Sequence, residues 1–379
     1  MSLRLFAFSA LLHAYIGLRL VPALSTWPAA AVGLALLLAM SSLLLPLGLG
    51  LRRRQSARWA SGIAWSSLLS MGFFSSLLVF TVLRDVALLL GSAFHAFWPG
   101  ENWWQELKVD SAMLVPIAAV VVTLIGLWNA RRTAAVVPID VPIANLPAAL
   151  HGFTIAQISD IHVGPTIRGP FVRAIVDAVN RLRADMVAVT GDLVDGTVAE
   201  LAPHVAPLAG LSSRHGTFFV TGNHEYYSGV HAWIDELRKL DVRVLLNEHV
   251  VLQHGEAALV VAGVADSSAH HFDRSHRSDP HAAIAGAPQD ASVRVLLAHQ
   301  PRSATAAADA GFDLQLSGHT HGGQFFPWNL VVRLQQPFTA GLHRLRNLWV
   351  YTSRGTGYWG PPKRFGAPSE ITLLRLIPA

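Results

Sequence analysis

The sequence predicts an α-helical membrane anchor followed by a layered α/β domain. The first third contains apolar windows of about 20 residues, which is the length of a membrane-spanning helix. The remainder alternates short β-rich runs with amphipathic helical stretches, and polar residues directly follow five of those runs. With 52% hydrophobic and only 14% charged residues, the chain is too apolar for an ordinary soluble protein.

Charged residues and histidines are distributed unevenly along the 379 residues. Residues 1–132 hold ten Lys and Arg against four Asp and Glu, whereas the remainder holds 19 against 20. Sixteen of the 18 histidines follow residue 150. The absence of cysteine excludes disulfide scaffolds, thiolate zinc sites and cysteine nucleophiles. The histidine-rich remainder therefore favours metal chemistry without sulfur ligands.

Four windows are long and apolar enough to cross a bilayer as helices: about residues 5–24, 27–50, 59–83 and 111–130. The first contains Arg19, which can snorkel to the nearer interface if the helix ends just beyond it. A cleaved signal peptide is the alternative for that window, but further apolar spans follow it. The stretch Val86–Trp98 is short for a span, so we expect an interfacial or re-entrant segment there.

Loop charges predict the orientation of these spans. Residues 51–58 (LRRRQSAR) and the pair Arg131–Arg132 are basic, whereas residues 99–110 are acidic on balance and contain a Trp pair. Basic loops stay in the cytoplasm, so four spans place the amino terminus and everything after Arg132 on that side. We expect a multi-pass inner (cytoplasmic) membrane protein whose second domain faces the cytoplasm.

A proline-containing linker, residues 133–150, separates the anchor from the second domain at residues 151–379. Pro138, Pro142 and Pro147 are spaced four and five residues apart, which is incompatible with a helix interior. We expect an extended connector or a first edge strand.

Polar motifs follow five β-rich runs of the second domain. The runs are FTIAQIS, MVAVT, TFFVT, VRVLLA and FDLQLS, separated by helical patterns such as Phe171–Arg183. The motifs that follow them are Asp160-Ile161-His162, Gly191-Asp192, Gly222-Asn223-His224-Glu225, His299-Gln300 and Gly318-His319-Thr320-His321. Because sites assemble at the carboxyl ends of strands in layered α/β folds, we expect these side chains to converge.

The convergent ligand types indicate a metal centre, although each motif alone is more typical of a surface turn. In the pairs D-x-H and H-x-H, an extended backbone puts both side chains on one face. Carboxylate, imidazole and amide ligands suit divalent Mn, Fe, Zn or Ni. Seven candidates exceed the needs of one ion, so we expect two divalent ions sharing a bridging carboxylate. The candidate ligands are Asp160, His162, Asp192, Asn223, His299, His319 and His321.

The ordered motifs D-x-H, G-D-x-x-D, G-N-H-E, H and G-H-x-H in residues 150–379 resemble those of calcineurin-like metallophosphoesterases. The resemblance implies two mixed β-sheets sandwiched between helices, a four-layer catalytic domain that hydrolyses phosphate esters or pyrophosphates by attack of a metal-bridging hydroxide. It implies one ion bound by Asp160, His162 and His321, and another bound by Asn223, His299 and His319, with Asp192 bridging. His224 would bind no metal; it would protonate the leaving-group oxygen or stabilise the phosphoryl oxygens, as an imidazole titrating near neutrality can.

Other residues near these motifs leave two interpretations open. Asp195 either orients His224 or a ligand imidazole, or lies in a surface turn; Glu225 receives no role. The polar segment Ser267–His281 is predicted to be an exposed loop near the site, with additional metal binding by its four histidines as the alternative. Seven aromatic and basic residues form either an amphipathic lip that receives a lipid phosphate or ordinary core and rim aromatics with solvated cations: Tyr226, Tyr227, Trp328, Tyr358, Trp359, Lys363 and Arg364.

The motif GHTHGGQ and the late segment Ser353–Gly357 (SRGTG) resemble the bacterial membrane-anchored branch of this family. Some members of that branch act on phospholipid-like substrates, including UDP-diacylglucosamine. We therefore expect the lipid bilayer and a phosphorylated, lipid-linked substrate as partners. A nucleotide phosphodiesterase or nuclease is the first alternative, although the near-neutral domain lacks the basic surface that nucleic acid requires. A non-catalytic membrane receptor or scaffold is the second.

Overall fold

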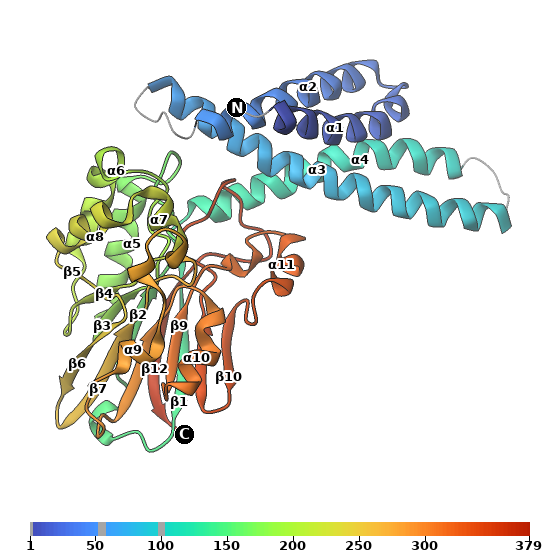
Figure 1. Ribbon diagram of the computed structural model, residues 1–379. Helices are drawn as coiled ribbons and strands as arrows, with labels where there is room; N and C mark the ends of the chain where they lie inside the picture. The colour runs from blue at the N-terminus through green and yellow to red at the C-terminus, as the bar shows by residue number, and fades with distance from the viewer. Residues whose placement is uncertain (1–2, 52–57, 98–102) are drawn as a thin grey trace. The chain divides into compact units, whose positions relative to one another are not determined.

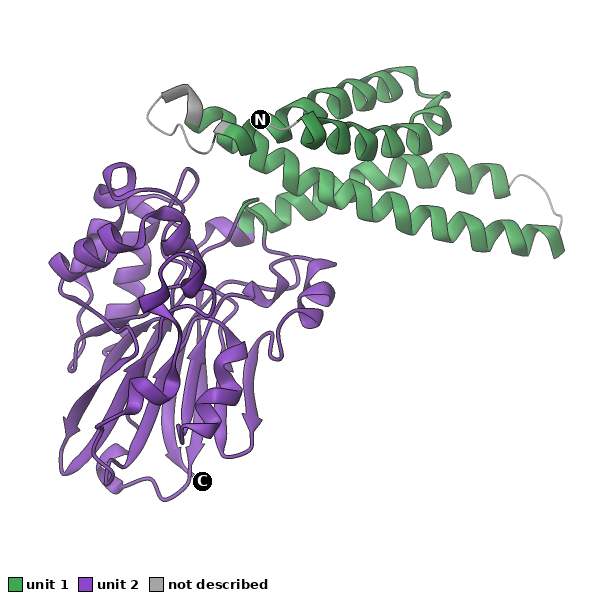
Figure 2. Ribbon diagram, viewed as in Figure 1, with its two compact units in different colours: residues 1–128, 360–363 green, residues 129–359, 364–379 purple. Residues whose placement is uncertain are grey.

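The computed structural model describes residues 3–51, 58–97 and 103–379. The chain divides into two compact units, residues 1–128 with 360–363 and residues 129–359 with 364–379 (Figure 2). The first unit is helical and the second is α/β (Figure 1). Most of the predicted basic loop, residues 52–57, and the start of the acidic loop, residues 98–102, lie outside the described residues.

Four long apolar helices supply the first unit: α1 (Leu3–Leu20), α2 (Pro28–Leu51), α3 (Arg58–Phe97) and α4 (Trp103–Arg131). Each is long and apolar enough to cross a membrane, which confirms the predicted four apolar helices. Ile16, Leu38 and Leu77 are buried among the helices, whereas Leu36 and Leu124 are among the many exposed leucines. Apolar side chains on both the inner and the outer faces suit a bundle surrounded by hydrocarbon.

Helix α3 contradicts the predicted end near residue 83. It continues to Phe97, so the expected interfacial or re-entrant segment is instead an extension of the same helix. The charges at its middle are partnered inside the unit: Arg84 donates to Ser111 Oγ at 2.9 Å and to the Lys108 carbonyl at 2.8 Å. Asp85 accepts a bond from Tyr15 Oη at 2.7 Å. Because both charges have partners inside the unit, neither Arg84 nor Asp85 requires the helix to end near residue 83.

Arg19 is also paired inside the first unit rather than only snorkelling. Its Nε lies 2.9 Å from Asp85 Oδ2, and Arg19 itself is one residue before the end of α1 at Leu20.

Helix α4 begins at Trp103, which makes residues 103–110 of the predicted acidic loop helical. The segment Gly360–Lys363 belongs to this unit, where Lys363 Nζ donates to the Gly72 carbonyl at 2.9 Å and contacts Ser76 Oγ.

The second unit contains two six-stranded mixed sheets (Figure 1). The first has the order β1 (Ala135–Ile143), β12 (Glu370–Pro378), β2 (Thr154–Ile158), β3 (Met186–Val189), β4 (Thr217–Phe219) and β5 (Val242–Val244). The second has the order β10 (Gly341–Leu345), β11 (Leu348–Thr352), β9 (Leu314–Ser317), β8 (Val293–Leu297), β7 (Ala257–Gly263) and β6 (Glu248–His254). Strands β2 to β5 run parallel, as do β7, β8, β9 and β11.

Three apolar cores arrange the second unit in four layers. Side chains from both sheets, such as Phe218 and Leu297, form the central core. The outer face of the first sheet packs on helices α5 (Gly169–Leu182), α6 (Val198–Val205) and α8 (Val230–Lys239). The second sheet is covered by α9 (Pro280–Ile284) and α10 (Ala304–Asp309). This arrangement confirms the predicted pair of mixed sheets sandwiched between helices.

The proline-containing stretch after the anchor forms an edge strand. Strand β1 pairs only with β12 and lies at the border of the first sheet. An edge strand tolerates Pro138 and Pro142 because proline cannot donate a bond to a second neighbouring strand. Of the extended connector and the edge strand expected for this stretch, the structure therefore shows the edge strand.

Candidate metal centre

The seven predicted ligands meet at one end of the sandwich. They follow β2, β3 and β4 of the first sheet and β8 and β9 of the second. Six of them are buried and His319 is half-buried. Parallel strands present their carboxyl ends at a common edge, so the strand order brings together residues that are far apart in the sequence.

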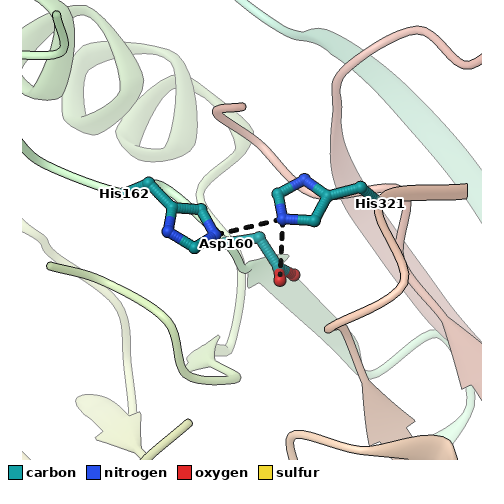
Figure 3. Close-up of side chains that lie close together, drawn as sticks. All are labelled: Asp160, His162 and His321. Carbon is teal, nitrogen blue, oxygen red and sulfur yellow. Dashed lines mark hydrogen bonds and ion pairs between the residues drawn. The ribbon is translucent and has the colours of Figure 1, made fainter. Parts of the chain in front are cut away.

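Asp160, His162 and His321 form the first cluster (Figure 3). The Nε2 atoms of the two histidines lie 3.0 Å apart, and His321 Nε2 lies 3.4 Å from Asp160 Oδ1. Figure 3 shows both rings pointing toward the same small volume beside the carboxylate. Three donors of this kind around one point form part of the coordination sphere of a divalent ion.

Asp192, His299 and His319 form the second cluster. His299 Nε2 lies 3.1 Å from Asp192 Oδ2 and 3.2 Å from His319 Nδ1. The same Asp192 oxygen lies 3.9 Å from His162 Nε2 in the first cluster. One carboxylate oxygen therefore lies between the two clusters, in the position of a bridging ligand.

The donors fit divalent ions on three structural grounds. Asn223 Oδ1 is buried and has no hydrogen-bond partner among the described residues, a costly arrangement that a cation would relieve. His299 Nδ1 lies 2.7 Å from the Thr190 carbonyl, which directs Nε2 to the cluster as in metal-binding histidines. In each cluster two imidazole nitrogens face one another within about 3 Å, the approach that a shared cation stabilises.

His224 lies beside Asp192 but outside both ligand sets of the resemblance. Its Nε2 is 4.0 Å from Asp192 Oδ2, and its Nδ1 is 2.5 Å from Asp195 Oδ1. Burial disfavours the charged ring, yet the carboxylates of Asp192 and Asp195 outweigh burial and raise the pKa of His224 to about 9. The ring is therefore held in position by Asp195, and the two carboxylates favour its protonated form.

Asp195 is a positioning residue rather than part of a surface turn. The same Oδ1 atom lies 3.1 Å from His162 Nδ1, so one carboxylate holds a candidate ligand and the candidate acid. Burial opposes ionisation of Asp195, but the two imidazoles lower its pKa below the ordinary value. Of the two alternatives predicted for Asp195, the structure therefore shows the first: the carboxylate orients the rings of His162 and His224.

Glu225 has a structural role that sequence reasoning missed. Its buried carboxylate accepts backbone N–H bonds from Gly222 at 2.6 Å, Leu193 at 2.8 Å and Asp192 at 3.0 Å. It thereby ties the loop after β3 to the loop after β4 and fixes the spacing between Asp192 and Asn223. A pattern search limited to neighbours along the chain cannot find this role, because two of its partners lie 32 and 33 residues away.

The backbone at the four ligands of D-x-H and H-x-H differs from the predicted extended segments, and Asp192 shares their conformation. Asp160, His162, Asp192, His319 and His321 all have φ between 51° and 70°. This left-handed region is uncommon for residues other than glycine and is concentrated at functional sites. Successive turns, rather than period-two alternation, therefore direct these side chains to the centre.

Glycines allow the loops to approach one another closely. A Cβ atom on Gly222 would lie 2.2 Å from Asp192 Oδ1, and one on Gly318 would lie 2.2 Å from Asp160 Oδ2. Any side chain at either position would displace a candidate ligand carboxylate. The glycines that precede Asn223 and His319 are thus part of the geometry of the centre.

The predicted lip is only partly formed. Tyr226, Tyr358, Lys363 and Arg364 are buried, whereas Tyr227, Trp328 and Trp359 are about half exposed. The rings of Tyr227 and Trp359 lie 5.3 and 5.9 Å from the His224 ring. The structure thus favours core and rim aromatics, but the two cations are buried rather than solvated.

Arg364 is a second positioning residue that the sequence pattern did not identify. Its guanidinium donates to the His321 carbonyl at 2.9 Å and lies 3.1 Å from His321 Nδ1. It also donates to the carbonyls of Gly357 and Arg354. The fully buried side chain therefore connects the late SRGTG segment to a candidate ligand, and no carboxylate is needed because backbone carbonyls satisfy its donors.

Comparisons with known proteins agree with this geometry. The family model for calcineurin-like phosphoesterases matches residues 153–323, which include all seven candidate ligands. A bovine (Bos taurus) protein called a transmembrane protein with metallophosphoesterase domain is 41% identical over 285 residues, covering 71% of this chain and 64% of the bovine protein. A zebrafish (Danio rerio) protein of the same name is 34% identical over 323 residues, covering 82% and 74%. A Campylobacter jejuni metallophosphoesterase is 38% identical over 250 residues, covering 65% and 64%.

Proposed function

This chain belongs to the calcineurin-like metallophosphoesterase family, and we propose that it is a membrane-anchored hydrolase of phosphate esters that uses two divalent metal ions. The observation that carries the proposal is the pair of ligand clusters with Asp192 Oδ2 between them and His224 alongside. Ions bound there supply the positive charge that activates water and stabilises the phosphoryl oxygens during displacement.

Seven residues of the chain would bind the two ions. Asp160, His162 and His321 would hold one ion, and Asn223, His299 and His319 the other, with Asp192 between them. Manganese, iron, zinc and nickel all suit this nitrogen and oxygen donor set. The buried positions of the ligands and the backbone bonds of Glu225 fix the site before substrate arrives, which lowers the reorganisation needed during reaction.

His224 would donate a proton to the leaving-group oxygen. Its Nδ1 bond to Asp195 directs the opposite ring nitrogen toward the clusters, and its side chain is 15% exposed and so accessible to substrate. A protonated imidazole beside the centre can neutralise the alkoxide or phosphate that departs. The exposed rings of Tyr227 and Trp359 border this acid and would contact the departing group.

We propose further that the substrate is a lipid-linked phosphate ester or pyrophosphate and that the second unit faces the cytoplasm. The support for the lipid is the anchor, because a soluble substrate gives no evident reason to hold a hydrolase on a bilayer. The support for the orientation is the distribution of basic residues next to the spans. UDP-diacylglucosamine is a suitable first probe because it joins a pyrophosphate to two acyl chains.

The decisive experiment compares two pyrophosphates that differ in their lipid. Detergent-purified protein with manganese is given UDP-diacylglucosamine in mixed micelles or water-soluble UDP-N-acetylglucosamine, and products are followed by phosphorus NMR. We expect UMP and a lipid monophosphate from the first substrate only. The His224→Ala variant, which retains every candidate ligand, is the matched control and should bind metal without turnover.

The outcomes separate the parts of the proposal. Hydrolysis of the soluble compound at an equal rate would remove the lipid assignment and leave the phosphoesterase. Metal-dependent turnover that persists in His224→Ala would remove the assigned acid. Failure of a broad series of phosphate esters, in protein that holds two ions, would contradict the proposed activity.

A further inference from the structure

We propose that His231, Asp273 and His276 form an additional binding site for a divalent transition metal, apart from the two clusters of the candidate metal centre. Each residue offers a ligand atom, and the three atoms lie within 4.8 Å of one another. His231 Nε2 is 3.1 Å from Asp273 Oδ2, and the two imidazole rings have centroids 5.3 Å apart. The site lies where the polar segment Ser267–His281 meets the start of helix α8.

The carboxylate of Asp273 is held so that one oxygen remains for a ligand. Its Oδ1 accepts bonds from Ser275 N at 2.9 Å and from Ser275 Oγ at 2.6 Å. These bonds begin the short helical turn Arg274–His276 and place His276 on the same side as the aspartate. Oδ2 is then directed toward His231 on the neighbouring helix.

Independent support comes from the partner of His276. The hydroxyl of the buried Tyr226 lies 2.9 Å from His276 Nδ1, and this contact leaves Nε2 as the available ligand nitrogen. Metal-binding histidines commonly use their second ring nitrogen in this way, because the bond fixes both the tautomer and the orientation of the ring. The exposed neighbours His270 and His271 differ, since neither belongs to the cluster.

The ligand set indicates the class of ion. Two imidazoles and one carboxylate without thiolate favour zinc, nickel or copper(II) over calcium or magnesium, which prefer oxygen ligands. The side chain of His231 is 70% exposed and that of Asp273 is 26% exposed, so water can complete the coordination sphere. An ion at this place would bind from solvent without passing through the buried centre.

Binding would fasten the segment Ser267–His281 next to the candidate active site. Phe272, which precedes Asp273, lies 5.8 Å from the Tyr226 ring and 5.5 Å from the Tyr227 ring. Tyr227 in turn contacts the ring of His224. An ion that joins the segment to α8 would therefore restrict the motion of the aromatic residues that border His224.

The test measures zinc in the detergent-purified full chain. Protein is loaded with zinc, free metal is removed, and bound zinc is counted by mass spectrometry. We expect three ions per chain in the unaltered protein, two in His231→Ala, and three in the matched control His270→Ala. Because His231 is exposed near the start of a helix, its truncation leaves no cavity. Tyr226→Phe should retain the site but weaken its affinity by about tenfold.

A structural readout accompanies the count. Arg274 and Arg277 are exposed in the segment, and zinc should slow tryptic cleavage after both in the unaltered protein but not in His231→Ala. Equal stoichiometry in His231→Ala and His270→Ala would overturn the proposal, and so would two ions in the unaltered protein. The proposal does not depend on the proposed hydrolase activity, because the experiment measures the number of bound zinc ions and not turnover.

Discussion

Replacing Glu225 by Gln tests whether this buried carboxylate holds the two ligand loops together. Both carboxylate oxygens are used: Oε2 accepts from Asp192 N and Gly222 N, and Oε1 accepts from Leu193 N and, at 3.4 Å, from Val194 N. A glutamine has only one acceptor oxygen, and its amide donors would face backbone donors on the other side. The substitution keeps the size of the side chain, so packing changes little and the hydrogen bonds dominate the effect.

The magnitude follows from the bonds that must be lost. In the more favourable amide orientation the bonds from Leu193 and, at the longer distance, Val194 disappear. Loss of the short Leu193 bond alone removes about 1.5–3 kcal/mol for a bond to a charged acceptor. The backbone donor left buried without an acceptor adds about 1–3 kcal/mol. A total of about 2.5–6 kcal/mol corresponds to a fall in Tm of about 5–24 °C for a domain of this size.

The assay is thermal unfolding of the detergent-purified protein followed by tryptophan fluorescence, together with metal content. Glu256→Gln is the matched control because Glu256 is exposed in the turn between β6 and β7, and its substitution should change stability by less than about 0.5 kcal/mol. We also expect weaker metal binding in Glu225→Gln, since Asp192 and Asn223 lose their fixed spacing. Equal Tm values for the two variants, with both ions retained, would refute the positioning role.

Four further predictions concern the centre and the orientation of the chain. His224→Ala should lower turnover about 10²–10⁴-fold at unchanged metal content, and loss of metal instead would show that His224 is a ligand. Asp192→Asn should weaken both ions, because one bridging charge is lost; calorimetric titration with unchanged affinities would contradict the bridge. Asp195→Asn should lower metal affinity about 10–100-fold through His162 and also reduce turnover, whereas an effect on neither would count against orientation. A reporter enzyme fused after Ala379 should show cytoplasmic activity, and periplasmic activity would reverse the proposed orientation.

The sequence predicted the layered fold and the convergence of the seven candidate ligands because both depend on repeating patterns. Alternating strands and helices determine which ends share an edge, and Asp160, Asn223 and His299 lie within four residues of the ends of β2, β4 and β8. The prediction that an extended backbone directs the ligands toward one another was wrong, because left-handed φ values depend on the surrounding loops. Glu225 and Arg364 were missed or misplaced because their partners are backbone groups, which every residue carries and no motif records.

In the first unit, too, the local sequence pattern predicted the helices but not a feature that depends on tertiary contacts. Four apolar helices could be recognised from length and composition alone. The extension of α3 beyond residue 83 could not, because a charge such as Arg84 ends a span only when it lacks partners. Those partners come from other helices, and the sequence does not state which helices are neighbours.

The position of β12 has a consequence for the order of folding. This strand lies between β1 and β2, although more than 200 residues separate it from either along the chain, and the pair Arg375 and Asp140 spans 235 positions. During synthesis β1 therefore lacks its strand partner, and β2 lacks one of its two partners, until β12 emerges from the ribosome. Contacts of such long range are slow to form and leave open strand edges in the meantime. The sheet that carries Asp160 and Asp192 is thus completed late, after the helices of the anchor have had time to enter the bilayer.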